Sequence, residues 1–160
     1  MKNIFLDFDG VMDTAYYGHV LGKEGLPCQD EFGAVFDPNC VRYLKEIIDK
    51  TGAEIVITSS WKSLMTYKEL LNMWEQRALP GNVIDMTPST PECRRRGDEI
   101  DAWLKECNEE CQYVILDDID ENNFNTHQIA NLIVVNPYYG LDARAAERAI
   151  KILEGRLNGT

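Results

Sequence analysis

Three stretches of the sequence place hydroxyl or carboxylate side chains directly after a short apolar run. Asp7 and Asp9 follow the run at 4–6, and the chain can turn at Gly10 immediately afterwards. The other two stretches are EIVITSSWK at 54–62 and YVILDD at 113–118. Carboxylates gathered at one point repel each other unless a cation neutralises them, and Mg²⁺ prefers such oxygen ligands. The pattern therefore indicates Mg²⁺-assisted chemistry on an anionic substrate.

The alternative is that these aspartates are ordinary solvated loop residues that cap helices. A single aspartate would usually have that role. Here acidic pairs follow two apolar runs, and a Thr-Ser turn follows a third. That coincidence favours a metal site.

The apolar runs predict five strands, at 4–6, 54–58, 83–84, 113–116 and 132–135. Near-continuous apolar runs are typical of strands that are covered on both faces. Helical patterns alternate with them, from Pro38 to Gly52 and over about 63–78, 97–108 and 142–156. This order predicts an α/β fold, a three-layer sandwich with a Rossmann-like parallel sheet flanked by helices.

Ligands of such sheets bind beyond the carboxyl ends of the strands, which is where the three polar stretches fall. We expect one domain over 1–160, with a short flap at about 12–36. The insertions are too short for a full cap domain, so the cap is minimal and the site is expected to be relatively open. The three tryptophans, Trp61, Trp74 and Trp103, are interpreted as core or groove-lining residues.

Three of these segments resemble motifs of the haloacid dehalogenase (HAD) superfamily. IFLDFDGV at 4–11 resembles its first motif, IVITSS at 55–60 its second, and YVILDD its fourth. More narrowly, TSSWK, RGDEIDAWL, VILDD and NPYYGLDARAAERAI resemble the HAD phosphatase domain of Swiss Army knife RNA-repair proteins. The resemblance implies a HAD-like fold and a Mg²⁺-dependent phosphohydrolase, specifically a phosphomonoesterase.

The resemblance also implies roles for individual residues. Asp7 would attack phosphorus to form an aspartyl-phosphate, and Asp9 would act as the acid and base. Mg²⁺ would be held by Asp7, by the backbone carbonyl of Asp9, and by Asp117 or Asp118. The phosphoryl oxygens would be bound by the Thr58 hydroxyl and the Ser59 backbone N–H.

The cation that the superfamily uses to bind phosphate has two candidates. Arg96 lies just before the predicted third helix and matches the arginine of the RGDEI block, whereas Lys62 follows the second motif. An arginine can hold a phosphate with two parallel hydrogen bonds, so it is a physically reasonable replacement for lysine. Arg94 and Arg95 are interpreted as solvated neighbours that could add to a local basic patch.

The formal net charge of −11 restricts the partners. A strongly acidic surface repels phosphate backbones and anionic membranes, so we expect no general nucleic-acid-binding surface. No apolar run approaches the roughly 18–20 residues of a membrane helix. The first apolar stretch also ends before the apolar core of about 7–15 residues that a secretory signal needs. The chain is therefore expected to be cytoplasmic and not membrane-bound.

Five cysteines cannot all pair within the chain. Cys107 and Cys111 are four residues apart on a predicted helix, where they would share a face. They could form half of a metal site. Because only two histidines are available, we favour two small core residues with free thiols in a reducing compartment.

Two alternatives compete with the phosphohydrolase. A two-component receiver domain also uses an acidic Mg²⁺ cluster, but its acidic pair follows the first strand and its lysine comes late, which is not the order here. A phospho-ligand binding or regulatory module with little turnover remains as the second alternative. The substrate is either a nucleic-acid end phosphate, most plausibly of RNA, or a small phosphorylated metabolite or nucleotide.

Overall fold

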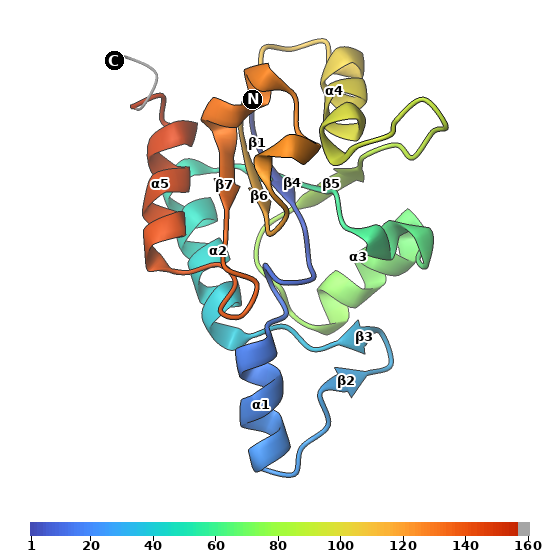
Figure 1. The fold of residues 1–160 in the computed structure, drawn as a ribbon, viewed down its shortest axis with the longest axis vertical. Helices are drawn as coiled ribbons and strands as arrows, with labels where there is room; N and C mark the ends of the chain where they lie inside the picture. Colours follow the sequence, from blue (N-terminus) through green and yellow to red (C-terminus); the bar gives the residue numbers. More distant parts are fainter. Residues whose placement is uncertain (157–160) are drawn as a thin grey trace.

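A five-stranded parallel sheet forms the centre of the protein in a computed structural model that describes residues 1–156 (Figure 1). Its order is β5-β4-β1-β6-β7. The strands are β1 (Lys2–Leu6), β4 (Glu54–Ile57), β5 (Val83–Met86), β6 (Gln112–Asp117) and β7 (Leu132–Val134). These strands match the five predicted runs, so the parallel sheet is confirmed.

Helices cover both faces of the sheet, and each face has its own core. Alternate residues of β1 point to opposite sides: Ile4 and Leu6 pack in the larger core, and Phe5 packs in the smaller one. The larger core is completed by α2 (Pro38–Thr51), α3 (Tyr67–Gln76) and α5 (Ala143–Leu153). The smaller core is completed by α4 (Arg96–Glu106) and the segments around η2 (Glu121–Asn123) and η3 (Thr126–Asn131). The three-layer α/β sandwich is therefore confirmed.

Local capping signals explain most helix boundaries. The Asp37 carboxylate accepts a hydrogen bond from the Asn39 N–H at the start of α2, and Gly52 ends the helix in the left-handed region with φ 70°. The predicted helix at 63–78 is shorter in the structure. The segment first forms a 3₁₀ turn, η1 (Ser60–Ser63), and α3 starts only where Thr66 caps it.

The predicted flap contains more structure than expected. It folds into α1 (Ala15–Lys23) and a two-stranded hairpin of β2 (Gln29–Asp30) and β3 (Gly33–Ala34). The helix was not predicted because two glycines inside it, Gly18 and Gly22, lower its intrinsic propensity. Thr14 connects it to the sandwich, since its hydroxyl caps α1 and donates to Asp37 at 2.8 Å.

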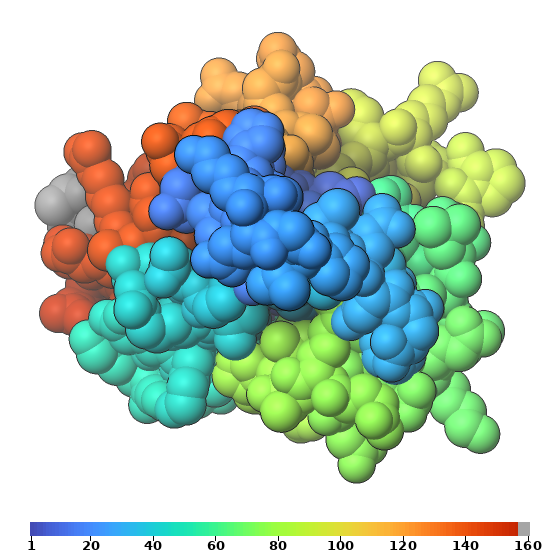
Figure 2. All heavy atoms as spheres, turned by 90° about the horizontal axis from the view of Figure 1, so that it is seen from below, coloured from blue at the N-terminus to red at the C-terminus, as the bar shows by residue number. Residues whose placement is uncertain are grey.

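The flap lies below the carboxyl ends of the strands in Figure 1. Seen from below, its blue spheres cross the middle of this face (Figure 2). Asp7 and Asp117, at the strand ends, are only 4% and 0% exposed. These two carboxylates are therefore buried, although Asp9 at the same edge is exposed.

The predicted placement of Cys107 and Cys111 on one helix is wrong. Helix α4 ends at Glu106, so Cys107 and Cys111 do not share a helix; they flank the turn before β6, with their sulfurs 3.2 Å apart. Both thiols are free and partly exposed. Within residues 1–156, no helix is long and apolar enough to cross a membrane.

Candidate active site

Three carboxylates converge where β1 and β6 end. These strands are neighbours, with Leu6 paired to Leu116, so the residues that follow them meet. Oxygens of Asp7, Asp117 and Asp118 all lie within 4.8 Å of one another. No other group of three or more metal-ligating side chains of this kind occurs in the part of the chain that the structure describes. The donor set suits Mg²⁺, which favours oxygen ligands.

Gly10 makes this convergence possible. Its φ is +77°, and a Cβ on it would lie 2.3 Å from an oxygen of Asp118 and 3.0 Å from Pro137. A side chain at this position would displace the Asp118 carboxylate. The turn after the first motif therefore needs glycine for both its backbone conformation and its close approach to the acidic cluster.

Crowding of the carboxylates changes how they titrate. Burial, followed by the nearby Asp117 carboxylate, raises the pKa of Asp7 from 3.8 to about 8. Burial also raises the pKa of Asp117, and the Arg96 guanidinium opposes this shift. The protein alone therefore holds a proton in this cluster near neutral pH. A divalent cation that replaces the proton would relieve the repulsion between the two carboxylates.

Of the two candidate cations, Arg96 is the one at the cluster. Its Nη1 lies 2.8 Å from Asp117 Oδ2 and 3.4 Å from Asp7 Oδ1. Lys62 is instead paired with Glu99 at 2.5 Å and donates to the hydroxyl of Thr87 at 2.8 Å. Its positive charge is thus already compensated by a carboxylate of α4.

The second motif contributes buried hydroxyls. Thr58 and Ser59 are both 0% exposed directly after β4. Ser59 Oγ caps the following 3₁₀ turn by accepting from Trp61 N at 3.2 Å, but Thr58 Oγ1 has no hydrogen-bond partner among the described residues. An unpaired buried hydroxyl typically costs about 1–3 kcal/mol. A ligand oxygen is the kind of partner that would satisfy it.

The Asp9 carboxylate is not part of the acidic cluster. It is exposed, and its Oδ1 accepts a hydrogen bond from Trp61 Nε1 at 2.9 Å. Its carboxylate is not part of the three-residue cluster, so only its backbone carbonyl remains available as the metal ligand that the resemblance implies.

Asp13 is a neighbour of Asp9 that the sequence analysis missed. Burial, followed by the neighbouring Asp9 carboxylate, raises the pKa of Asp13 from 3.8 to about 8. The only signal in the sequence is a third acidic residue four positions after Asp9. That spacing is too common to indicate chemistry without the observed turn.

Comparison with known families agrees with this geometry. The family described as HAD domain in Swiss Army Knife RNA repair proteins matches residues 3–146. The chain belongs to this HAD family. No curated protein and no solved structure is significantly similar to it. Membership of a HAD family indicates chemistry of the phosphohydrolase type, and it favours this interpretation over a receiver domain.

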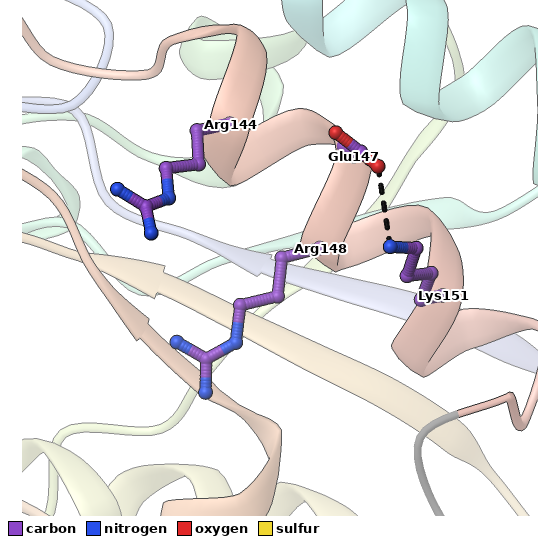
Figure 3. Close-up of a pocket in the computed structure, with 4 residues that line it drawn as sticks. All are labelled: Arg144, Glu147, Arg148 and Lys151. Atoms are coloured by element: carbon purple, nitrogen blue, oxygen red, sulfur yellow. Dashed lines mark ion pairs between the residues drawn. The ribbon is translucent and has the colours of Figure 1, made fainter.

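Besides its acidic cluster, the HAD domain has a hollow along α5. It has a volume of about 350 Å³ and is lined by Arg144, Glu147, Arg148 and Lys151 (Figure 3). None of the cluster's aspartates lines it, and Lys151 is paired with Glu147 at 3.1 Å. We therefore place the candidate active site at the strand ends.

The suggested basic patch beside the site is largely neutralised. Arg96 and Lys62 have carboxylate partners, as described above. Arg95 contacts both Asp98 and Asn125. Arg94 is exposed, and only its backbone N–H is engaged by Asp98 among its described hydrogen bonds. Among the described residues, Arg94 is therefore the one cation of this patch whose side chain has no carboxylate partner.

Proposed function

We propose that this HAD domain is a Mg²⁺-dependent phosphomonoesterase that acts through an aspartyl-phosphate on Asp7. The observation that carries the proposal is the convergence of Asp7, Asp117 and Asp118 with the Arg96 guanidinium at the ends of β1 and β6. A lone acidic cluster would suit a metal alone. A cation beside the predicted nucleophile also suits the anionic group that the nucleophile attacks.

In the first step, an oxygen of Asp7 attacks phosphorus and the bond from phosphorus to the ester oxygen breaks. Asp7 Oδ1 is oriented by the Phe8 N–H at 2.8 Å and by Arg96, which favours attack by Oδ2. Arg96, the Thr58 hydroxyl and the Ser59 backbone N–H bind the phosphoryl oxygens. Asp9 gives its proton to the leaving oxygen, which departs as an alcohol.

In the second step, water attacks phosphorus and the bond to Asp7 breaks, which releases inorganic phosphate. Asp9, now ionised, takes the proton of the attacking water. A hydrogen bond from Trp61 Nε1 at 2.9 Å holds the Asp9 side chain in one orientation. One residue thus serves as acid and then as base.

Mg²⁺ would be held by Asp7, Asp117 or Asp118, and the Asp9 carbonyl. When bound, it neutralises the acidic cluster and the charge of the phosphoryl group. The raised pKa of Asp7 fits the binding of a metal ion at the acidic cluster. The Thr58 hydroxyl, which has no hydrogen-bond partner among the described residues, fits the binding of a phosphoryl oxygen.

The test is hydrolysis of p-nitrophenyl phosphate with Mg²⁺ and with a chelator. Asp7→Asn should abolish turnover and Asp9→Asn should slow it severely, whereas Asp49→Asn, which makes the same charge change on the exposed surface, should leave it unchanged. Wild-type protein quenched during turnover should carry one phosphoryl group on Asp7. Hydrolysis by Asp7→Asn at the wild-type rate would refute the nucleophile assignment.

The substrate class is the least constrained part of the proposal. The family's description and the short flap favour a phosphate at a nucleic-acid end, and the net charge of −11 favours a small metabolite or nucleotide. The two substrate classes can be distinguished by measuring kcat/KM at equal salt. End-phosphorylated oligoribonucleotides would be compared with nucleoside monophosphates and sugar phosphates. A phospho-ligand module would bind these compounds without turnover.

A further inference from the structure

We propose that the flap hairpin and Trp61 form a leaving-group pocket that selects phosphate esters carrying one uncharged aromatic ring system. The inference rests on the proposed phosphomonoesterase function and names the chemistry of its substrate. It concerns a pocket that Asp9 lines and the three aspartates of the acidic cluster do not, and it assigns a specificity role to hairpin residues that the mechanism does not use.

The pocket adjoins the group that would protonate the leaving oxygen. It has a volume of about 250 Å³, and its wall includes the Asp9 carboxylate. The other lining residues are contributed by the hairpin, by η1 and by the segment that follows η1: Gln29, Phe32, Gly33, Ala34, Trp61, Leu64 and Met65. Because the ester oxygen must reach Asp9 to receive a proton, the group attached to that oxygen is directed toward this space.

The wall suits an uncharged ring. Among the residues that line the pocket, Asp9 is the only charged one, and most of the others are apolar or aromatic. Once Asp9 has given up its proton, its negative charge would repel an anionic leaving group. The volume lies below the roughly 300–1,000 Å³ of pockets for drug-sized ligands, so it matches a single ring system. The rings of Phe32 and Trp61 and the adaptable thioether of Met65 are favourable neighbours for such a ring.

Hydrogen bonds from Arg77 fix the position of the hairpin that forms one wall of the pocket. Arg77, on the C-terminal side of α3, donates to both oxygens of Asp30 at 2.7 and 2.9 Å and to the Gly33 carbonyl at 3.2 Å. Its guanidinium also lies 5.9 Å from the centres of the Phe32 and Trp61 rings. This bidentate pair ties the hairpin to the sandwich. Arg77 and Asp30 are therefore positioning residues for the pocket wall.

Gly33 shows how the hairpin is packed, and Leu64 adds a sign of a binding surface. A Cβ on Gly33 would lie 3.2 Å from the Trp61 ring, so the hairpin backbone packs directly against the indole. Leu64, at the rim, is 82% exposed, the most exposed of the large apolar side chains described. An exposed leucine next to aromatic residues and a catalytic carboxylate is placed to contact a bound ring.

The experiment compares alkyl phosphates whose leaving alcohols have similar acidity, so that intrinsic reactivity does not set the order. We expect kcat/KM for benzyl phosphate to exceed that for ethyl phosphate by at least about tenfold, as hydrophobic pockets discriminate by about 10–200-fold per small group. Cyclohexylmethyl phosphate and phosphocholine should be poorer than benzyl phosphate. Uridine 5′-phosphate against ribose 5-phosphate forms a second matched pair, in which a nucleobase supplies the ring.

Substitutions in the pocket wall test whether these residues cause the preference for benzyl over ethyl phosphate. Leu64→Ala and Phe32→Ala should each lower the benzyl-to-ethyl ratio by about three- to tenfold, the loss expected when part of an apolar wall is removed. Leu71→Ala, which truncates an exposed leucine of α3 away from the pocket, is the matched control and should leave the ratio unchanged. Asp30→Asn should lower the ratio through KM rather than kcat.

The outcomes separate the two proposals. Turnover of all esters without a preference in either matched pair overturns the pocket assignment alone. Equal rates for benzyl and cyclohexylmethyl phosphate, or a preference for phosphocholine, overturn the aromatic-ring assignment. Absence of turnover on every ester overturns the phosphomonoesterase function, and the pocket inference with it.

Discussion

Replacing Asp7 with asparagine should stabilise the metal-free protein while abolishing its activity. Burial and the neighbouring Asp117 raise the pKa of Asp7 from 3.8 to about 8. At pH 7 the unfolded chain has this carboxyl ionised, whereas the folded protein has it mostly protonated. Folding must therefore take up a proton, which is unfavourable at this pH.

The magnitude follows from the size of this shift. Between pH 3.8 and pH 7 the protonation costs about 1.4 kcal/mol per pH unit, or about 4 kcal/mol in total. The asparagine side chain of the variant would need no proton and could still accept the hydrogen bond from the Phe8 N–H. We expect a gain of about 2–4 kcal/mol in the free energy of unfolding, which for a chain of this size raises Tm by about 5–15 °C.

The dependence on pH has a definite sign. Because the folded wild-type protein binds more protons than the unfolded chain between pH 3.8 and about 8, its stability falls as pH rises through this window. The variant lacks this dependence. Its advantage should be absent near pH 4 and should grow toward pH 8.

The assay is urea or thermal unfolding in the presence of a chelator, with Asp49→Asn as the control. That control makes the same charge change at an exposed ion pair, which is worth little. Saturating Mg²⁺ should close the gap, because it stabilises the wild-type protein by binding to the folded state. If the Asp7→Asn protein is less stable than wild type with a chelator at pH 7, the reasoning about the acidic cluster is wrong.

Three further outcomes are expected. Gly10→Ala should destabilise the fold by about 1–3 kcal/mol for the left-handed backbone alone and weaken Mg²⁺ binding measured by calorimetry, since its Cβ would meet the acidic cluster. The Asp30–Arg77 pair lowers the pKa of Asp30, so the stability difference between wild type and Asp30→Asn should be present at pH 7 and lost as pH falls through that lowered pKa. Arg96→Ala should reduce kcat/KM by about 10²-fold and more than Lys62→Ala does; the reverse order would assign the phosphate-binding role to Lys62.

Much of the fold could be predicted because its signals are local. The five strands follow from apolar runs, and the helix that starts at Pro38 follows from an aspartate, a proline and a closing glycine. The same locality explains the errors. Helix α1 was not predicted because two glycines lower its helix propensity. The start of α3 was predicted too early because Ser59 caps a 3₁₀ turn that precedes the helix.

The sequence by itself determined that Asp7 and the Asp117–Asp118 pair would meet, because parallel strands bring the residues after their carboxyl ends to one edge. Only the tertiary structure decided how the charges are paired around them. Arg96 turns toward Asp117, while Lys62 is held by Glu99, 37 positions away in the chain. Likewise, no local pattern connects Arg77 with Asp30 across 47 positions. Such partners are selected by packing, since a long charged side chain can reach several carboxylates and the fold determines which one lies within hydrogen-bonding distance.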